Sequence, residues 1–272
     1  MKAVADGRAR SGQTRKLLTY QIRNVARGRA VIGYGLTLLL VAWALVRFGG
    51  GTSRALLSMG SVVLIVVPLV SLVLGTIHFY DAREFDELVL THPVDRRQLF
   101  RGLYFGLTIP MSVAYLVAIL LPLTLGGMDA GSLGAVMTLA GTGVFLTAIF
   151  VALAYWIAVK FDEPMKGLGL VLATWLFFGV LYDGLVLMAA NAFSAYPLER
   201  PMLALMMLNP VDLARVLLLM QLDVAALMGY TGAVFKAFFG SAVGPLISIG
   251  MLSAWVAGPF WMGMRLFDRK DL

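Results

Sequence analysis

The stretch Arg83–Gly102, REFDELVLTHPVDRRQLFRG, is a charged segment between two long apolar runs. Three acidic residues, Glu84, Asp86 and Glu87, precede Pro93 in this segment, and three arginines, Arg96, Arg97 and Arg101, follow it. Proline breaks a helix, and Asp95 is a residue type that caps the next one. The spacing therefore predicts a helix, a turn and a second helix that lie across one face of a membrane.

The sequence on both sides of this segment is apolar enough to lie in a bilayer. Of the 272 residues, 60% are hydrophobic and 14% are charged, whereas soluble domains are about half apolar and about a quarter charged. Runs of about 20 apolar residues cross the hydrocarbon core as helices, because lipid offers no partners to backbone polar groups. We expect six spans, near 31–48, 57–79, 103–125, 133–159, 167–190 and 244–264. The predicted fold class is all-α, one polytopic membrane domain over residues 1–272.

Positive residues indicate the orientation of the spans. Most of the 22 lysines and arginines lie in the leader 1–30, in Arg83–Gly102, between the fourth and fifth spans, and in the tail. Positive residues concentrate on the cytoplasmic side, so both termini and Arg83–Gly102 are expected there. The net charge of +7 therefore reflects topology and not nucleic-acid binding.

The leader itself has no short apolar core with a cleavage site, so we expect no removable signal peptide. Residues 14–30 show the amphipathic pattern of a helix that lies in the membrane interface. The alternative is a disordered basic leader that only enforces topology.

The connection 191–243 is the longest on the opposite, outer face. Asp212 stands where the first turn of a helix is expected, and an acid is favourable at that position. We expect one or two short helices that lie against the outer membrane face. The stretch 213–229 is apolar, but Arg215 and Asp223 argue against a lipid-exposed span.

Signatures of catalysis are missing from this sequence. It contains no P-loop, no H-E-x-x-H zinc motif, no G-x-S-x-G nucleophile elbow and 0 cysteines. His78 and His92 are too few for a metal site, and we interpret them as structural. Asp183 lies inside the fifth apolar stretch, where a carboxylate is costly. Asp183 either belongs to a transport or signal pathway, or is a satisfied acid near the outer interface, for example one bonded to a neighbouring tyrosine.

Residues 87–102, ELVLTHPVDRRQLFRG, resemble the cytoplasmic coupling segment of type 2 ABC transporter permeases (the ABC-2 family), whose pattern is close to LELLLSLPVSRRELLLGK. The closing stretch RLFDRKDL, 265–272, resembles the family's final aromatic followed by R-R-D-L. The chain departs from the pattern at Glu84–Phe85, where the family commonly has Gly-Thr, and at Arg101–Leu103, where Gly-Lys is usual.

The resemblance implies the non-catalytic membrane subunit of a homodimeric complex, with ATP and magnesium bound by a separate cytoplasmic ABC ATPase and no cofactor in this chain. It places the ATPase-coupling residues in the segment, at Glu84, Asp86, Glu87, Pro93, Arg96 and Arg97. ATPase closure moves a permease only if a stiff element contacts it differently in the two states. The alternative is a solvated loop with ordinary topogenic charges.

A narrower resemblance lies in the second half. Residues 165–187 and 205–219 are similar to the copper-processing permeases encoded with nitrous oxide reductase. This similarity implies the bacterial or archaeal cell (inner) membrane, a periplasmic partner protein and a part in copper-centre assembly. Met202, Met206 and Met207 are soft ligands suited to Cu(I), but methionine is also a flexible packing residue and suits a docking surface.

Two other functions stay open at this point. One is a general ABC-2 exporter of lipid, drug or polysaccharide. The other, from a different class, is an intramembrane enzyme, which needs convergent Ser, His, Asp or Glu pairs within the spans. The sequence offers only the isolated Asp183 for such chemistry.

Overall fold

The computed structural model describes residues 22, 25–89, 96–126, 130–193, 199–221 and 243–270, and these contain helices and short connections without a strand. Six helical stretches are long and apolar enough to cross a membrane: Arg29–Phe48, Thr52–Ala82, Arg96–Leu125, Leu133–Lys160, Pro164–Ala192 and Gly244–Arg269. They coincide with the six predicted spans, which confirms the all-α polytopic fold.

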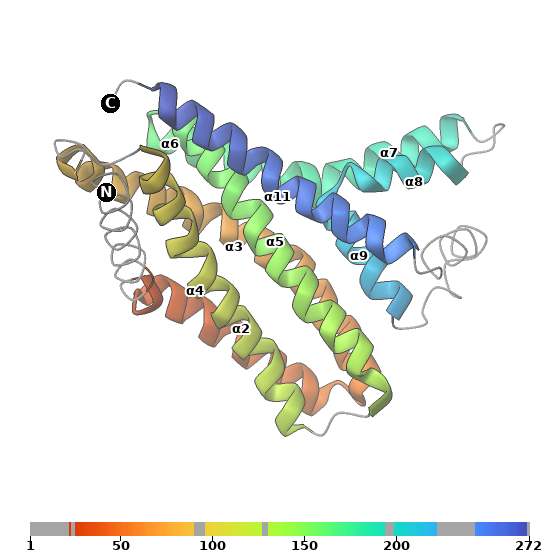
Figure 1. The fold of residues 1–272 in the computed structure, drawn as a ribbon. Coiled ribbons are helices and arrows are strands. Elements are labelled where there is room, and N and C mark those ends of the chain that lie inside the picture. Colours follow the sequence, from red (N-terminus) through yellow and green to blue (C-terminus); the bar gives the residue numbers. More distant parts are fainter. Residues whose placement is uncertain are drawn as a thin grey trace, which may run out of the picture.

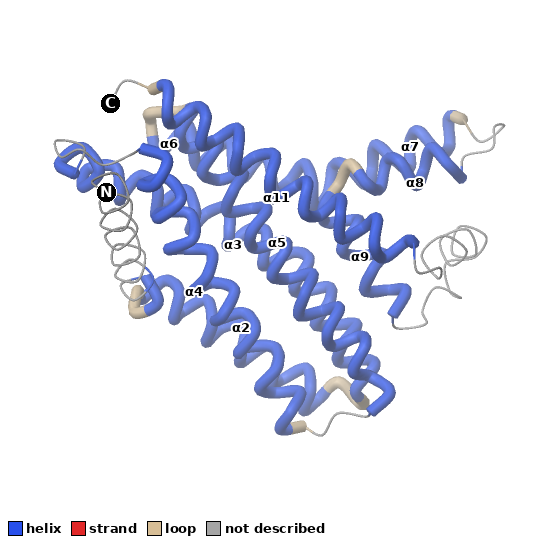
Figure 2. Tube along the Cα trace, in the orientation of Figure 1, coloured by secondary structure: helices blue, strands red, loops and turns tan. Residues whose placement is uncertain are grey.

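The elements follow one another as α2 (Arg29–Phe48), α3 (Thr52–Val89), α4 (Arg96–Leu125), the 3-10 helix η1 (Ala130–Ser132), α5 (Leu133–Lys160), α6 (Pro164–Leu176), the π-helix η2 (Phe177–Leu181), α7 (Tyr182–Ala192), α8 (Glu199–Met207), α9 (Pro210–Gln221) and α11 (Val243–Arg269) (Figure 1). The fifth span consists of α6, η2 and α7 in succession. Figure 2 shows the described connections in tan, and those between α2 and α3 and between α5 and α6 are short.

Helix α5 is the centre of the bundle. It contacts α3, α11, α4 and α9, and 67% of its most apolar window is buried. Its sequence is apolar on all sides and rich in alanine and glycine, as expected for a helix surrounded by others. Gly143 is one such position, because a Cβ atom there would overlap the ring of Tyr115. The Tyr115 hydroxyl donates to the Leu139 carbonyl at 2.7 Å, which fixes α4 against α5.

The fifth span is the least buried of the six described spans. Only 6% of its apolar window is buried within the chain, against 22% for α2 and for the last span. Large apolar side chains such as Leu187 and Met188 are each 68% exposed. In a membrane this surface faces lipid or another apolar chain.

The Arg83–Gly102 segment is formed by the ends of two spans. Helix α3 continues to Val89 and α4 begins at Arg96, so a helix is present on each side of the predicted break. These helices are continuous with the second and third spans, and are not the separate elements that the sequence pattern predicted. Residues 90–95, which include Pro93, lie outside the described residues, as do residues 14–21, 23 and 24 of the leader.

The connection 191–243 contains two short helices, α8 and α9, as predicted; residues 222–242 lie outside the described part. The prediction that these helices lie against a membrane face is wrong for α9, which packs onto α5, α3 and α11. Val211, Leu213 and Ala214 are at most 2% exposed. Burial of this apolar face against α5 removes more apolar surface from water and headgroups than a position on the outer face would.

Candidate functional site

The first candidate site joins the start of α4 to the end of α11. We name it the C-terminal charge cluster, and it consists of Arg96, Arg97, Asp162, Asp268 and Lys270. Arg97 donates to the Asp268 carboxylate from Nη2 at 2.8 Å and from Nε at 3.1 Å. Arg96 donates to the backbone carbonyl of Lys270. The Lys270 ammonium donates to the Asp162 carboxylate at 2.7 Å. The cluster thus contacts α4, α11 and the turn between α5 and α6.

Aromatic side chains fill the space beneath this cluster. The fully buried Phe100 packs against Phe267 and Tyr155, with ring centroids 5.7 and 5.9 Å apart. The Tyr155 hydroxyl donates to the Leu103 carbonyl at 3.1 Å and lies 2.8 Å from Nδ1 of His78. His78 therefore has a packed partner, as expected of a structural histidine. His92 lies outside the described residues.

The predicted coupling residues divide into two groups. Glu84, Asp86 and Glu87 lie on the last turns of α3, while Pro93 lies outside the described residues. Arg96 and Arg97 begin α4, and both bond to the end of α11. The sequence analysis did not identify Asp268 and Lys270, to which these two arginines bond. Both residues lie in the closing stretch RLFDRKDL, whose resemblance to the family indicated a role but did not predict a contact partner.

The second candidate site joins α7 to α9. We name it the α9 cluster, and it consists of Asp183, Asn209, Asp212 and Arg215. Nη1 of Arg215 lies 2.7 Å from the Asp183 carboxylate and 3.1 Å from the Asp212 carboxylate. Asp183 is therefore paired with an arginine 32 residues along the chain, and not with the tyrosine that served as an example of a partner. The hydroxyl of Tyr182 instead donates to the Leu205 carbonyl at 2.6 Å.

Asn209 connects this cluster to the π-helix η2. Its amide nitrogen donates to the Phe178 carbonyl at 2.9 Å and to Asp212 at 3.0 Å. Its amide oxygen accepts from the Val211 backbone N–H at 2.9 Å, which caps the first turn of α9. A π-helix shifts the backbone bonding pattern and opens a carbonyl to outside donors, and such helices recur at functional sites. The sequence N-P-V-D-x-x-R thus connects α9 to the fifth span in two places, through Asn209 to Phe178 of η2 and through Arg215 to Asp183 of α7.

Two carboxylates share one guanidinium in the α9 cluster. The Asp212 side chain is only 8% exposed, and among the described residues its Oδ1 has the ion pair with Arg215 at 3.1 Å but no hydrogen bond. Burial, followed by the nearby Asp183 carboxylate, raises the pKa of Asp212 to about 7, against the opposing effects of Arg215 and Asn209. The cluster can therefore hold a proton close to neutral pH.

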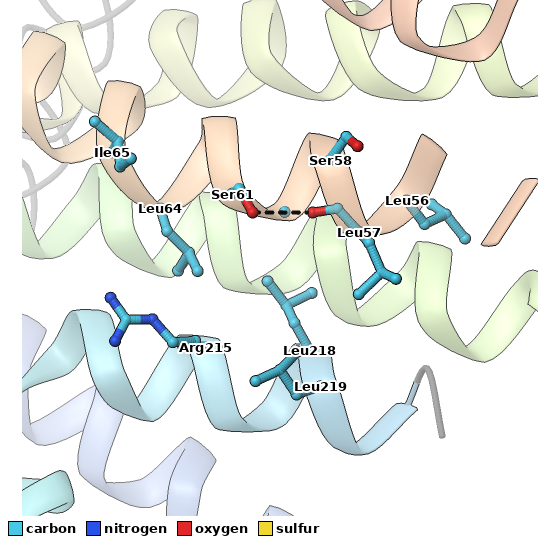
Figure 3. Close-up of a pocket in the computed structure, with 10 residues that line it drawn as sticks. Leu56, Leu57, Ser58, Ser61, Leu64, Ile65, Arg215, Leu218 and Leu219 are labelled. Atoms are coloured by element: carbon cyan, nitrogen blue, oxygen red, sulfur yellow. Dashed lines mark hydrogen bonds between the residues drawn. The ribbon is translucent and has the colours of Figure 1, made fainter. Parts of the chain in front are cut away.

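A groove of about 370 Å³ between α3 and α9 reaches the α9 cluster. Leucine side chains, including Leu57, Leu64 and Leu218, line most of it, and Arg215 lies beside them (Figure 3). The Ser61 hydroxyl in the groove wall donates to the Leu57 carbonyl of its own helix at 3.2 Å. The groove is thus mostly apolar, with Ser58, Ser61 and Arg215 as its polar side chains.

The three methionines that the sequence analysis considered for copper lie in α8. Met202 and Met206 are one helical turn apart, and Met206 packs against the hydrophobic core. The backbone carbonyl of Met207 accepts from the Trp255 indole at 3.2 Å. The described residues contain no group of three or more His, Cys, Asp or Glu that could hold a metal.

Comparison with known proteins agrees with this architecture. The model of the ABC-2 family transporter protein matches residues 53–272, so the chain belongs to the ABC-2 transporter family. A relative named "Probable ABC transporter permease protein NosY" from Pseudomonas aeruginosa is 30% identical over 268 residues, which cover 88% of this chain and 90% of the relative. A protein of the same name from Stutzerimonas stutzeri is 27% identical over 230 residues, covering 77% and 75%. The chain is a multi-pass permease subunit of an ABC transporter.

Proposed function

We propose that this permease receives the movement of a cytoplasmic ABC ATPase through Arg83–Gly102 and serves copper-centre maturation of nitrous oxide reductase. Two copies of the chain would meet two ATPase subunits, which bind ATP and magnesium. The chain itself would carry no catalytic residue and no cofactor. It would lie in the cell (inner) membrane with both termini in the cytoplasm, because its positive residues concentrate on that side.

The observation that carries the coupling role is the attachment of Arg96 and Arg97 to the end of α11. The segment continues directly into α4, which has 30 residues. A helix of this length extends over about 45 Å, because each residue adds about 1.5 Å. A force on the segment would therefore act along a complete span, and through the C-terminal charge cluster on a second one.

The copper role is supported by the two relatives named NosY and by the similarity at residues 165–187 and 205–219. A periplasmic partner would dock on the outer connection 191–243. Met202, Met206 and Met207 offer thioethers to Cu(I) as a passing cargo or an apolar surface to that partner. The contact between Asp183 and Arg215 places the proposed pathway residue at the junction of α7 and α9.

Co-expression with the ATPase encoded beside this chain tests the coupling role. We expect the ATPase to co-purify with the wild-type permease and to be lost when Glu87→Lys is combined with Arg96→Glu. The matched control is Arg54→Glu, which reverses an exposed arginine at the far end of α3. Failure of the ATPase to associate with the wild-type chain would contradict the coupling role.

The copper role needs a separate measurement. In a nitrous oxide-reducing host, deletion of this gene should yield reductase with depleted copper in metal analysis, and the wild-type gene should restore it. Replacement of Met202, Met206 and Met207 together by leucine separates the two uses of these residues. Full copper content in that variant would favour a docking surface over thioether ligation.

An export function for apolar cargo is the second candidate. An apolar cavity of about 500 Å³ lies among α4, α5 and α11, lined by residues such as Leu116, Phe145 and Val256. A lipid or drug would fit such a wall better than a metal ion. ATP-dependent movement of a labelled lipid in vesicles, with unchanged reductase copper after gene deletion, would favour this candidate.

A further inference from the structure

The end of α11 contacts two parts of the chain that are remote in sequence. Asp268 bonds to Arg97 at the start of α4 at 2.8 Å. Two residues later, Lys270 donates to the Val159 carbonyl at 2.6 Å and to Asp162 at 2.7 Å. The acceptors of Lys270 belong to the last turn of α5 and to the turn that follows it. One short piece of chain thus connects the coupling segment to the central helix.

Packing beneath these bonds keeps the three helices in register. Phe267, the residue before Asp268, is 3% exposed. Its ring lies 5.7 Å from that of Phe100 in α4 and 6.1 Å from that of Phe79 in α3. Tyr80 in α3 donates to the Phe161 carbonyl in the same α5–α6 turn at 2.7 Å. The polar bonds of Asp268 and Lys270 therefore lie on a buried aromatic base.

The charged pairs differ from this base because water reaches them. The Arg97 and Asp268 side chains are 57% and 32% exposed, and those of Lys270 and Asp162 are 23% and 61% exposed. Exposed pairs contribute little to stability. Bonds of this strength can break and re-form when α4 moves, and a conformational change is transmitted only through contacts that differ between its two states.

We infer that Asp268 and Lys270 are positioning residues of the coupling segment, which hold the start of α4 to the α5–α6 turn so that movement of the segment reaches α5 and α11 together. The inference rests on the proposed role of Arg83–Gly102. Movement of the segment would then reach α5, the most buried of the six described spans, through Asp268 and Lys270.

The test uses the permease assembled with its ATPase in lipid nanodiscs. The damaging variants are Asp268→Asn and Lys270→Met, and the conservative variants are Asp268→Glu and Lys270→Arg, which keep the charges. The matched control is Lys166→Met. Within the described part of the chain, Lys166 pairs with Glu163 three residues before it at 2.8 Å, with both side chains about two-thirds exposed. The readouts are ATPase association, melting temperature and ATP turnover of the complex relative to the free ATPase.

We expect the damaging variants to keep ATPase association and melting temperature and to lower the stimulation of turnover about threefold, as loss of one exposed contact from a coupled network would. The conservative variants and Lys166→Met should resemble wild type. Wild-type stimulation in Asp268→Asn and Lys270→Met, with the ATPase bound, overturns the inference and leaves the proposed function intact. An equal loss in Lys166→Met also overturns it, because the effect would then follow surface charge in general.

Two further outcomes are distinguishable. If Lys270→Met does not fold, the inference is tested with Asp268→Asn, at a more exposed position, by ATPase association, melting temperature and ATP turnover. If wild type binds no ATPase, the proposed coupling role fails first, and the inference fails with it.

Discussion

The C-terminal charge cluster and the α9 cluster are both built from arginine and aspartate, but they differ in burial. Arg97 and Asp268 are 57% and 32% exposed, whereas Arg215 and Asp212 are 36% and 8% exposed. An exposed pair gains little net energy, while removal of one partner from a buried set leaves a charge without compensation. We therefore expect the same residue types to contribute more to stability in the α9 cluster than in the C-terminal charge cluster.

The two clusters also differ in the balance of positive and negative charge. The Asp268 carboxylate lies near Arg97, Arg96 and Arg269, so positive charge prevails around it. In the α9 cluster Arg215 is shared by two carboxylates. The first arrangement tolerates loss of one arginine, but the second does not. The following predictions test this contrast, beginning with the largest expected effect.

Replacement of Arg215 by methionine should be the most damaging single change. It leaves Asp183 and the buried Asp212 close together without their shared cation, which is more damaging than loss of a partner from an exposed pair. Thermal unfolding in lipid nanodiscs would measure the loss. Arg54→Met, at an exposed position, is the control. Equal melting of wild type and Arg215→Met would show that the α9 cluster does not stabilise the fold.

Asn209→Ala should have the next largest effect. The change removes the donors to the Phe178 carbonyl and to Asp212 as well as the cap of α9. Buried groups left without a hydrogen bond cost about 1–3 kcal/mol. We expect a lower melting temperature and faster proteolysis in the 199–221 region. Asn191→Ala, at an exposed position of α7, should behave as wild type, and similar melting of both variants would refute the capping argument.

The stability of the fold should depend on pH through Asp212. Its pKa is raised in the folded chain from 3.8 to about 7, so the folded state keeps a proton that the unfolded state releases. Stability should therefore fall as pH rises from about 4 to about 7 and then level off, since the unfolded state binds fewer protons in that window. Melting temperature measured against pH tests the sign. Asp212→Asn should flatten the curve, and an unchanged slope would assign the effect to another group.

Arg97→Met should have the smallest effect on stability, because its pair with Asp268 is exposed and screened by salt. The melting temperature should differ little from that of wild type, while ATP turnover of the assembled complex, relative to the free ATPase, should fall. A loss of stability comparable with that of Arg215→Met would remove the contrast between the two clusters.

The limits of the sequence analysis are clearest at Asp183 and α9. The cost of a carboxylate in an apolar span predicted that Asp183 has a special environment, and the structure supplies Arg215 as its partner. Nothing in the local pattern paired these residues, because 32 positions separate them. Arg215 argued correctly against a lipid-exposed span, but the same reasoning placed α9 on the surface. Its apolar face packs against α5, a contact that no periodicity specifies.

The six spans, the helical character and the interruption between α3 and α4 were determined by the sequence alone. Each depends on local chemistry: apolar length matched to the bilayer, and charges that lipid excludes. The tertiary structure decided which helix is central, where α9 packs, and that Arg96, Arg97 and Asp162 meet the end of α11. These features depend on contacts between distant residues, which only the packing of complete helices brings together.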